Sequence, residues 1–272
     1  MTSRKISLLC LGVVLMWAFA SPAQQAHAQS TRPLPPWQNL TQAQLTAVWW
    51  QWVLGIPLSV NPLVDTSGAH AFEEQPYSDL LFLCGTLIVN GLPSGDVEGK
   101  VTRSIRVKEG TALFFPLLNT EADNVCGIPH LGENDPSNSD SCLAAQLSTH
   151  GLGIPQLRAI AAAQMDSATD LKAKLINPIG SSIDVSHNRL QSPIFSYTLP
   201  PAPNNMLDFF GIHNVSGRVS PVVSDGHWSF VPGLMVPGFY TLQFGGSVPF
   251  IGNDNNPHTF TEVITYEITV IP

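Results

Sequence analysis

The chain has 272 residues, of which 44% are hydrophobic and only 12% are charged, and its formal net charge is −8. This composition excludes a disordered chain and favours a well-packed, β-rich exported protein. An acidic surface repels phosphate backbones, so nucleic-acid binding and direct attraction to anionic lipid are both disfavoured.

The first 28 residues have the pattern of a secretory signal peptide. Arg4 and Lys5 form a basic start, residues 6–20 are apolar, and Ala26-His27-Ala28 is a cleavage site of the A-x-A type. The apolar run is short for a membrane span, and no other stretch is long enough. We therefore expect residues 1–28 to be removed. The mature chain, residues 29–272, is expected to be a single domain without a membrane span, secreted or periplasmic.

Three cysteines remain after such cleavage. Cys126 and Cys142 bracket a polar loop and are the natural disulfide partners in an oxidising compartment. Cys84 lies in an apolar run and is expected to be a buried thiol. A zinc site is disfavoured, because the cysteines lack the C-x-x-C and H-x-x-x-H spacings of such sites.

A helix is predicted from the capping box Thr41-Gln42-Ala43-Gln44 to Gly55. Its apolar stripe should anchor it on a sheet. Trp50 falls off this stripe, which makes it the candidate for an exposed ligand contact. The stripe consists of Leu45, Val48, Trp49, Trp52 and Val53.

Most of the remaining chain is predicted to form strands joined by turns. The alternation is clearest over Thr259–Ile271, and Asp170–Ile176 with Ser182–Ser186 resembles a hairpin. Glycines at 226 and 245–246 are expected to mark a turn and a strand end. A second helical region is predicted over Leu143–Ala168. Strands without a βαβ rhythm indicate a mainly β fold, an antiparallel, jelly-roll-like β-sandwich with an N-terminal helix and one or two others.

The most polar stretch, Thr120–Cys142, is predicted to be a loop. Glu121 and Asp123 are candidates for a catalytic carboxylate pair of the glycoside-cleaving kind, or for oxygen ligands of Ca²⁺. The spacing does not match an EF-hand, and a disulfide-tied surface loop explains the same composition. No metal site and no cofactor are assigned.

Two further polar arrangements have both a structural and a functional interpretation. His227 follows Asp225 by two positions, so the pair could act as a general base, or Asp225 could contact a ligand. A turn carboxylate beside a half-buried imidazole explains the same pattern. Arg103 shares a strand face with apolar residues, so it is expected to pair with Asp65 or Glu121.

Several motifs together resemble a family of uncharacterised secreted bacterial proteins, whose markers are a Trp-Trp-Gln-Trp helix and a Gly-x-x-Leu-Phe-Phe-Pro strand. The resemblance implies a domain extent and a compartment, but no activity. Cysteines that the family pattern often has near His70 and Ser104 are missing here. The motifs include Trp49-Trp50-Gln51-Trp52, Asn61-Pro62, Gly110 with Leu113-Phe114-Phe115-Pro116, Ser192-Pro193-Ile194-Phe195-Ser196 and Asp225-Gly226.

No complete catalytic motif is present, since the G-x-S-x-G elbow, the P-loop, H-E-x-x-H and the dinucleotide fingerprint are all missing. The first expectation is therefore a non-catalytic secreted binding module for a glycan or another cell-surface partner. A secreted carbohydrate-active enzyme, a hydrolase or lyase using Glu121, Asp123 and His227, is the second. A structural envelope protein is the third.

Overall fold

The computed structural model of the chain describes residues 37–87, 95–123, 152–209, 213–234, 236–251 and 256–272. The predicted signal peptide and both cysteines of the predicted disulfide, Cys126 and Cys142, lie outside these residues. Those two expectations remain predictions, as does the extent of the mature domain.

The N-terminal helix α1, Gln42–Gly55, follows a short 3-10 turn, η1, at Trp37–Asn39. The predicted capping box is confirmed: Thr41 Oγ1 accepts from the Gln44 amide at 3.2 Å, and Gln44 Oε1 accepts from the Thr41 amide at 2.9 Å. All five residues of the apolar stripe are buried. The sequence therefore predicts the start of α1 and its apolar stripe, but the helix also buries residues off the stripe, such as Trp50 and Leu54.

Sheet A contains five strands in the order β1, β3, β8, β6, and β7 also pairs with β8. β1 pairs with β3 in parallel, and the other pairs are antiparallel. The bounds are Leu80–Phe82 for β1, Ala112–Asp123 for β3, His187–Gln191 for β6, Phe195–Leu199 for β7 and Gly217–Val231 for β8.

Sheet B has the order β2, β10, β9, β4, β5, with β2 parallel to β10. The predicted strand at the C-terminus is β10, and the predicted hairpin is β4 with β5. The bounds are Val97–Lys108 for β2, Thr169–Ile176 for β4, Ser182–Asp184 for β5, Gly238–Ile251 for β9 and Pro257–Ile271 for β10.

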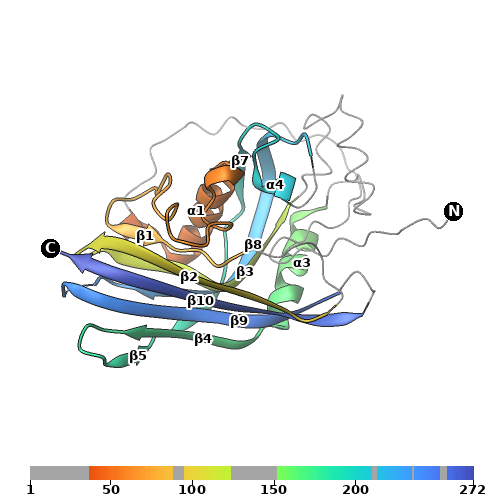
Figure 1. The fold of residues 1–272 in the computed structure, drawn as a ribbon. Helices are drawn as coiled ribbons and strands as arrows, with labels where there is room; N and C mark the ends of the chain where they lie inside the picture. The colour runs from red at the N-terminus through yellow and green to blue at the C-terminus, as the bar shows by residue number, and fades with distance from the viewer. Residues whose placement is uncertain (1–36, 88–94, 124–151, 210–212, 235, 252–255) are drawn as a thin grey trace.

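The protein is mainly β, and its sheets pack as a sandwich, with α1 on the outer side of sheet A and α3 at one end, where it contacts β8 and β9 (Figure 1). Side chains from β3, such as Phe115, meet side chains from sheet B, such as Phe244, with ring centroids 4.6 Å apart. The other face of sheet A packs against α1, where Trp49 lies edge-on to Trp228 at 5.4 Å. Sheet A is therefore the middle of three layers.

Three short helical elements complete the described chain. The helix α3, Ile154–Asp166, is shorter than the predicted Leu143–Ala168 region and packs on β3 and β8 through Leu157 and Ala161. The helix α4, Met206–Phe209, contacts the 3-10 turn η2, Leu58–Val60.

Strand pairing differs from the sequence expectation in two respects. Two pairs, β1 with β3 and β2 with β10, are parallel, so the sheets are mixed and not purely antiparallel. The glycines taken as strand breaks lie inside strands: Gly226 is in β8, and Gly245 and Gly246 are in β9.

Candidate functional site

Glu121 and Asp123 lie at the end of β3 and not in a loop, which corrects the prediction for this part of the chain. Residues two apart on a strand project from the same face, with Cα atoms about 6.6 Å apart. Both carboxylates are buried, with exposed fractions of 1% for Glu121 and 3% for Asp123. Two buried carboxylates side by side need a specific cause, because burying a charge is costly.

The strand register fixes the neighbours of these carboxylates. In the pairing of β3 with β8, Glu121 is opposite Ser224 and Asp123 is opposite Val222, which belongs to the core under α1. Tyr197 of β7 also belongs to this core, and its hydroxyl donates a short hydrogen bond to Asp123 Oδ2. The carboxylate pair therefore faces the α1 side of sheet A.

Burial, and then the adjacent negative charge of Asp123, raise the pKa of the Glu121 carboxyl well above its usual range. Burial and the same two carboxylates also raise the pKa of the Tyr197 hydroxyl. Tyr197 therefore stays protonated as a donor to Asp123. Glu121 tends to hold a proton, which makes it a hydrogen-bond donor as well as an acceptor.

Polar atoms without a hydrogen-bond partner concentrate on this same side of sheet A. Among the described residues, seven buried side-chain nitrogen or oxygen atoms have no hydrogen-bond partner. Five of the seven belong to this region, and we call their residues the polar row. Such atoms are rare in folded proteins, because each costs the free energy of its lost hydration. The five atoms are Trp50 Nε1, Asn119 Nδ2, Glu121 Oε2, Ser224 Oγ and Trp228 Nε1.

Gly226 lies in the middle of the polar row and leaves space for its neighbours. It is opposite Asn119 in the pairing of β3 with β8. A side chain at this position would lie 2.7 Å from both Asn119 Cβ and Trp228 Nε1. The absence of a side chain at Gly226 thus lets the Trp228 indole lie close to Asn119. Following the strands, the row runs from Trp228 past Asn119 to Ser224 and Glu121.

Trp50 is connected to the strand residues of the polar row through Trp49, which contacts both Trp50 and Trp228. Its ring lies edge-on to Trp49 at 5.1 Å, and Trp49 lies edge-on to Trp228. The expectation that Trp50 is exposed is wrong, because only 3% of it is exposed. Trp49 and Trp52 instead donate their indole N–H groups to the carbonyls of Leu83 and Glu73, at 2.9 and 2.8 Å. Trp50 therefore cannot provide an open stacking platform, but its indole N–H has no acceptor among the described residues.

The chemistry of the polar row is a mixture of donors and acceptors. The indole and amide N–H groups only donate, the Ser224 hydroxyl does both, and the carboxyl of Glu121 accepts and, when protonated, donates. A hydroxyl group also donates and accepts, so a hydroxyl-bearing ligand can satisfy both kinds of atom. A bare cation would satisfy only the oxygens.

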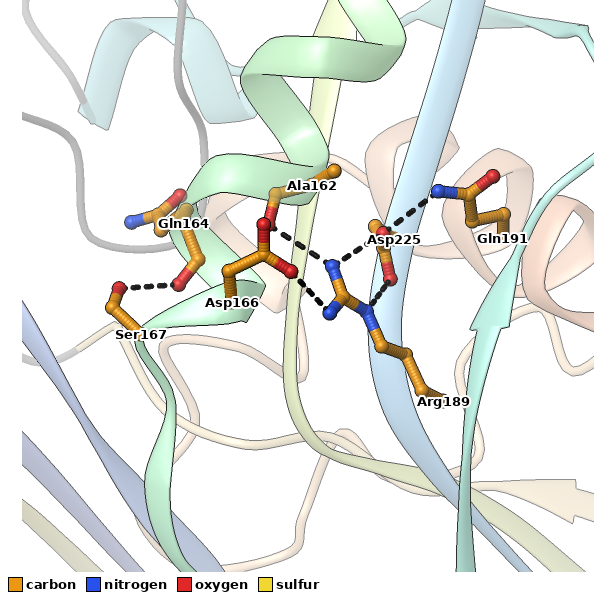
Figure 2. A network of polar contacts seen from close by, with 7 residues as sticks. All are labelled: Ala162, Gln164, Asp166, Ser167, Arg189, Gln191 and Asp225. Carbon is orange, nitrogen blue, oxygen red and sulfur yellow. Dashed lines mark hydrogen bonds and ion pairs between the residues drawn. The ribbon is translucent and has the colours of Figure 1, made fainter.

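Asp225 lies on the opposite face of β8, away from the polar row. Figure 2 shows it bound by Arg189 and Gln191 of β6, while Arg189 also reaches Asp166 and the Ala162 carbonyl at the end of α3. Arg189 donates two hydrogen bonds of 3.0 Å to the carboxylate of Asp225. These bonds connect β6, β8 and α3, so the contacts of Asp225 are structural ones.

His227 shares the face of Asp225, as its position two residues away predicts, but its ring forms a hydrogen bond with the backbone of Met165. This ring is 5.6 Å from that of His187, in an edge-on arrangement. Burial, and then the neighbours His187 and Arg189, lower the pKa of His227. The sequence therefore grouped His227 with Glu121 and Asp123 incorrectly, since they lie on opposite faces of sheet A.

Arg103 forms the other buried polar cluster. It is 1% exposed, and its donors reach the carbonyls of Asp65, Cys84, Pro62 and Gly85 and the hydroxyl of Tyr266, at 2.7–3.0 Å. The predicted carboxylate partner is wrong, because Arg103 contacts Asp65 through its carbonyl. Cys84 is a buried free thiol, as predicted, and burial raises its pKa.

Metal and membrane features can be assessed only for the described residues. Within these, no group of three or more His, Cys, Asp or Glu side chains is arranged to hold a metal ion. Most of the predicted Ca²⁺ loop, residues 124–142, lies outside them. In the same part of the chain, no helix combines the length and the apolar character that crossing a membrane requires.

Comparisons of the chain with protein-family models, with curated proteins and with solved structures find no match. The function is therefore argued from the polar row alone. Of its members, the sequence singled out Glu121 and Trp50. Asn119, Ser224 and Trp228 were missed, because only the register of β3 with β8 brings them together.

Proposed function

We propose that the protein is a secreted, non-catalytic binding module whose ligand is a small glycan or the terminal sugar of a cell-surface glycan, held at the polar row. The observation that carries the proposal is the set of five buried side-chain nitrogen and oxygen atoms on one side of sheet A that have no hydrogen-bond partner among the described residues. Sugar hydroxyls can accept from the indoles of Trp50 and Trp228 and from Asn119, and can donate to Glu121.

The position of the polar row limits the size of the ligand. Because the unpartnered atoms of the row are covered, a long chain cannot lie along them, and we therefore propose a ligand of one or two sugar rings. The row ends at the last residues of β3, so a ligand would approach from that end of sheet A. Side chains must move to admit it, and association should be slow for a small ligand.

A glycan array tests this proposal directly. We expect the mature protein to bind a restricted set of glycans, and Glu121→Leu to lose most of that signal because this variant has neither the donor nor the acceptor of the protonated carboxyl group. Asp166→Asn is the matched control, because Asp166 is an exposed carboxylate beside α3, on the other face of sheet A. A mature protein that binds no glycan, or a Glu121→Leu variant that binds like the wild type, would contradict the proposal.

One observation favours a second candidate, a carbohydrate-active enzyme. Glu121 and Asp123 are adjacent carboxylates, and the pKa of Glu121 is raised by burial and by Asp123. A protonated acid beside a second carboxylate is the arrangement that glycoside cleavage requires. An enzyme would release new reducing ends or unsaturated sugars from the bound glycan, and Glu121→Gln would abolish this release while leaving glycan binding measurable. A structural envelope protein would show neither binding nor turnover.

A further inference from the structure

A separate cavity of about 360 Å³ lies between the edges of the two sheets. β1 is the edge strand of sheet A and β2 the edge strand of sheet B, and residues from both line the cavity. It also includes Thr111, which precedes β3, whereas Glu121 lies ten residues further along this strand, about 30 Å away. The cavity is therefore independent of the polar row.

We propose that this cavity binds a small organic anion, a carboxylate attached to a short hydrocarbon body. Its volume falls within the range of small-molecule sites, which are mostly apolar with a few polar groups that orient the ligand. The proposal rests on an apolar floor, a pair of cations and one buried hydroxyl beside the cavity.

The floor and one wall of the cavity are apolar, and hydrogen bonds fix the wall to β1. Leu80 and Leu81 of β1 are buried, while Phe72 at the rim is 50% exposed. Gln75 fixes the wall to the edge of β1, because its amide group exchanges hydrogen bonds of 2.9 Å with the backbone of Phe82. A hydrocarbon body would find apolar contacts here without any rearrangement of the strands.

The charged groups around the cavity have one sign. Arg106 and Lys108 project from β2 on its exposed side, and neither forms an ion pair with another described residue. No Asp or Glu of the described chain lines the cavity, although the whole chain has 20 acidic residues against 12 basic ones. A local pair of cations in an acidic protein favours an anionic ligand.

Tyr77 places a buried hydroxyl group beside the cavity, where it could orient a bound ligand. It lines the cavity, its ring packs edge-on against Phe82 at 6.1 Å, and its buried hydroxyl has no hydrogen-bond partner among the described residues. Burial raises the pKa of this hydroxyl, so it remains a donor. This hydroxyl is covered, so the Tyr77 side chain must turn toward the cavity before a ligand carboxylate can accept from it while pairing with Arg106 or Lys108.

Isothermal titration of the mature protein with octanoate, octan-1-ol and octylammonium tests the proposal. We expect one octanoate per chain, with octan-1-ol at least tenfold weaker and no binding of octylammonium. The double variant Arg106→Gln/Lys108→Gln should weaken octanoate binding by about five- to tenfold, the range for two partly exposed charge interactions. Tyr77→Phe should weaken it about three- to tenfold.

Two control variants show whether octanoate binds at this cavity or elsewhere on the protein. Lys100→Gln removes a cation from the same side of β2 but outside the cavity, and it should leave octanoate binding unchanged. Glu121→Gln should also leave it unchanged, whatever its effect on glycan binding. The proposal is overturned if octanoate does not bind, if octan-1-ol binds equally well, or if the double variant binds octanoate like the wild type.

Discussion

Glu262 is a single residue whose environment makes the stability of the whole protein depend on pH. It lies on β10, is 8% exposed, and accepts a short hydrogen bond from the backbone amide of Thr86. Burial raises the pKa of its carboxyl from 4.5 to about 7, against the opposing effects of that hydrogen bond and of Arg103. A side chain at Gly85 would collide with this carboxyl group.

The raised pKa predicts a fall in stability as pH rises. The unfolded chain releases the Glu262 proton near pH 4.5, whereas the folded protein holds it until about pH 7. Between these values the unfolded state binds fewer protons, so the contribution of Glu262 to the free energy of unfolding decreases by about 3 kcal/mol and then stays constant. Urea denaturation across this window should show a decrease for the wild type that includes a contribution from Glu121, and Glu262→Gln should make the decrease clearly shallower.

The exposed carboxylate of Glu98, on β2, provides the control for that experiment. Glu98→Gln should keep the wild-type pH dependence. A Glu262→Gln variant whose unfolding free energy still falls as steeply with pH as that of the wild type would show that other buried groups, such as Glu121, cause the effect.

Arg103 shows what the sequence could and could not predict at the residue scale. Its burial follows from the alternation of β2, in which it shares a face with Val101 and Ile105. The expectation of a carboxylate partner was reasonable, because a buried charge needs compensation. The actual partners are mainly backbone carbonyls from residues 62–65 and 84–85, and no local pattern indicates that these loops meet at Arg103.

At the scale of elements, the connection between β6, β8 and α3 depends on Asp225. This carboxylate is 1% exposed and receives two hydrogen bonds from Arg189, whereas Asp166, the other carboxylate bound by Arg189, is 65% exposed. Hydrogen bonds to buried charged groups contribute more than those at the surface. The two carboxylates should therefore differ strongly in their contribution to stability.

Thermal or urea denaturation of two matched variants measures this difference. Asp225→Asn should lower the free energy of unfolding by about 2 kcal/mol, because Arg189 loses a buried charged partner. Asp166→Asn should lower it by less than about 0.5 kcal/mol. Equal effects of the two substitutions would contradict the structural role assigned to Asp225.

The elements themselves were predictable where local chemistry determines them. α1 has a capping box and an apolar stripe, and β10 alternates along its whole length, so both were identified. Gly226, Gly245 and Gly246 were misread as breaks. Each lies inside a strand where neighbouring atoms approach closely, as Leu171 and Leu118 do at Gly246. Such tertiary contacts leave no signal in the local sequence.

At the scale of the whole molecule, sheet A separates two different environments. One face packs against sheet B around an apolar core that includes Phe115, Leu242 and Ile264, and it carries Asp225 and its partners beside α3. The other face packs against α1 and includes both apolar side chains and the polar row. The sandwich could be predicted from the strand content of the sequence, but the polar row could not. It depends on β3 pairing with β8, and these strands are more than 90 residues apart in the sequence.

The two proposed sites lie toward opposite ends of β3, and their chemistry is complementary to different ligands. The polar row offers neutral donors and the carboxyl group of Glu121 for a hydroxyl-rich ligand, whereas the cavity between β1 and β2 offers cations for an anion. Because they share only the framework of sheet A, a substitution in one site should leave binding at the other unchanged. The variants described above test that independence.

The central claim is that the polar row binds a hydroxyl-bearing ligand, and the indole N–H resonances of the mature protein test it most directly. Three indoles already donate to protein acceptors, Trp37 to Asp79, Trp49 to Leu83 and Trp52 to Glu73, while those of Trp50 and Trp228 have no partner among the described residues. A ¹H–¹⁵N spectrum recorded during titration with a glycan selected on the array should show downfield shifts for Trp50 and Trp228, with the other three unchanged. Shifts confined to Trp37, or to no indole at all, would place the glycan elsewhere and contradict the account.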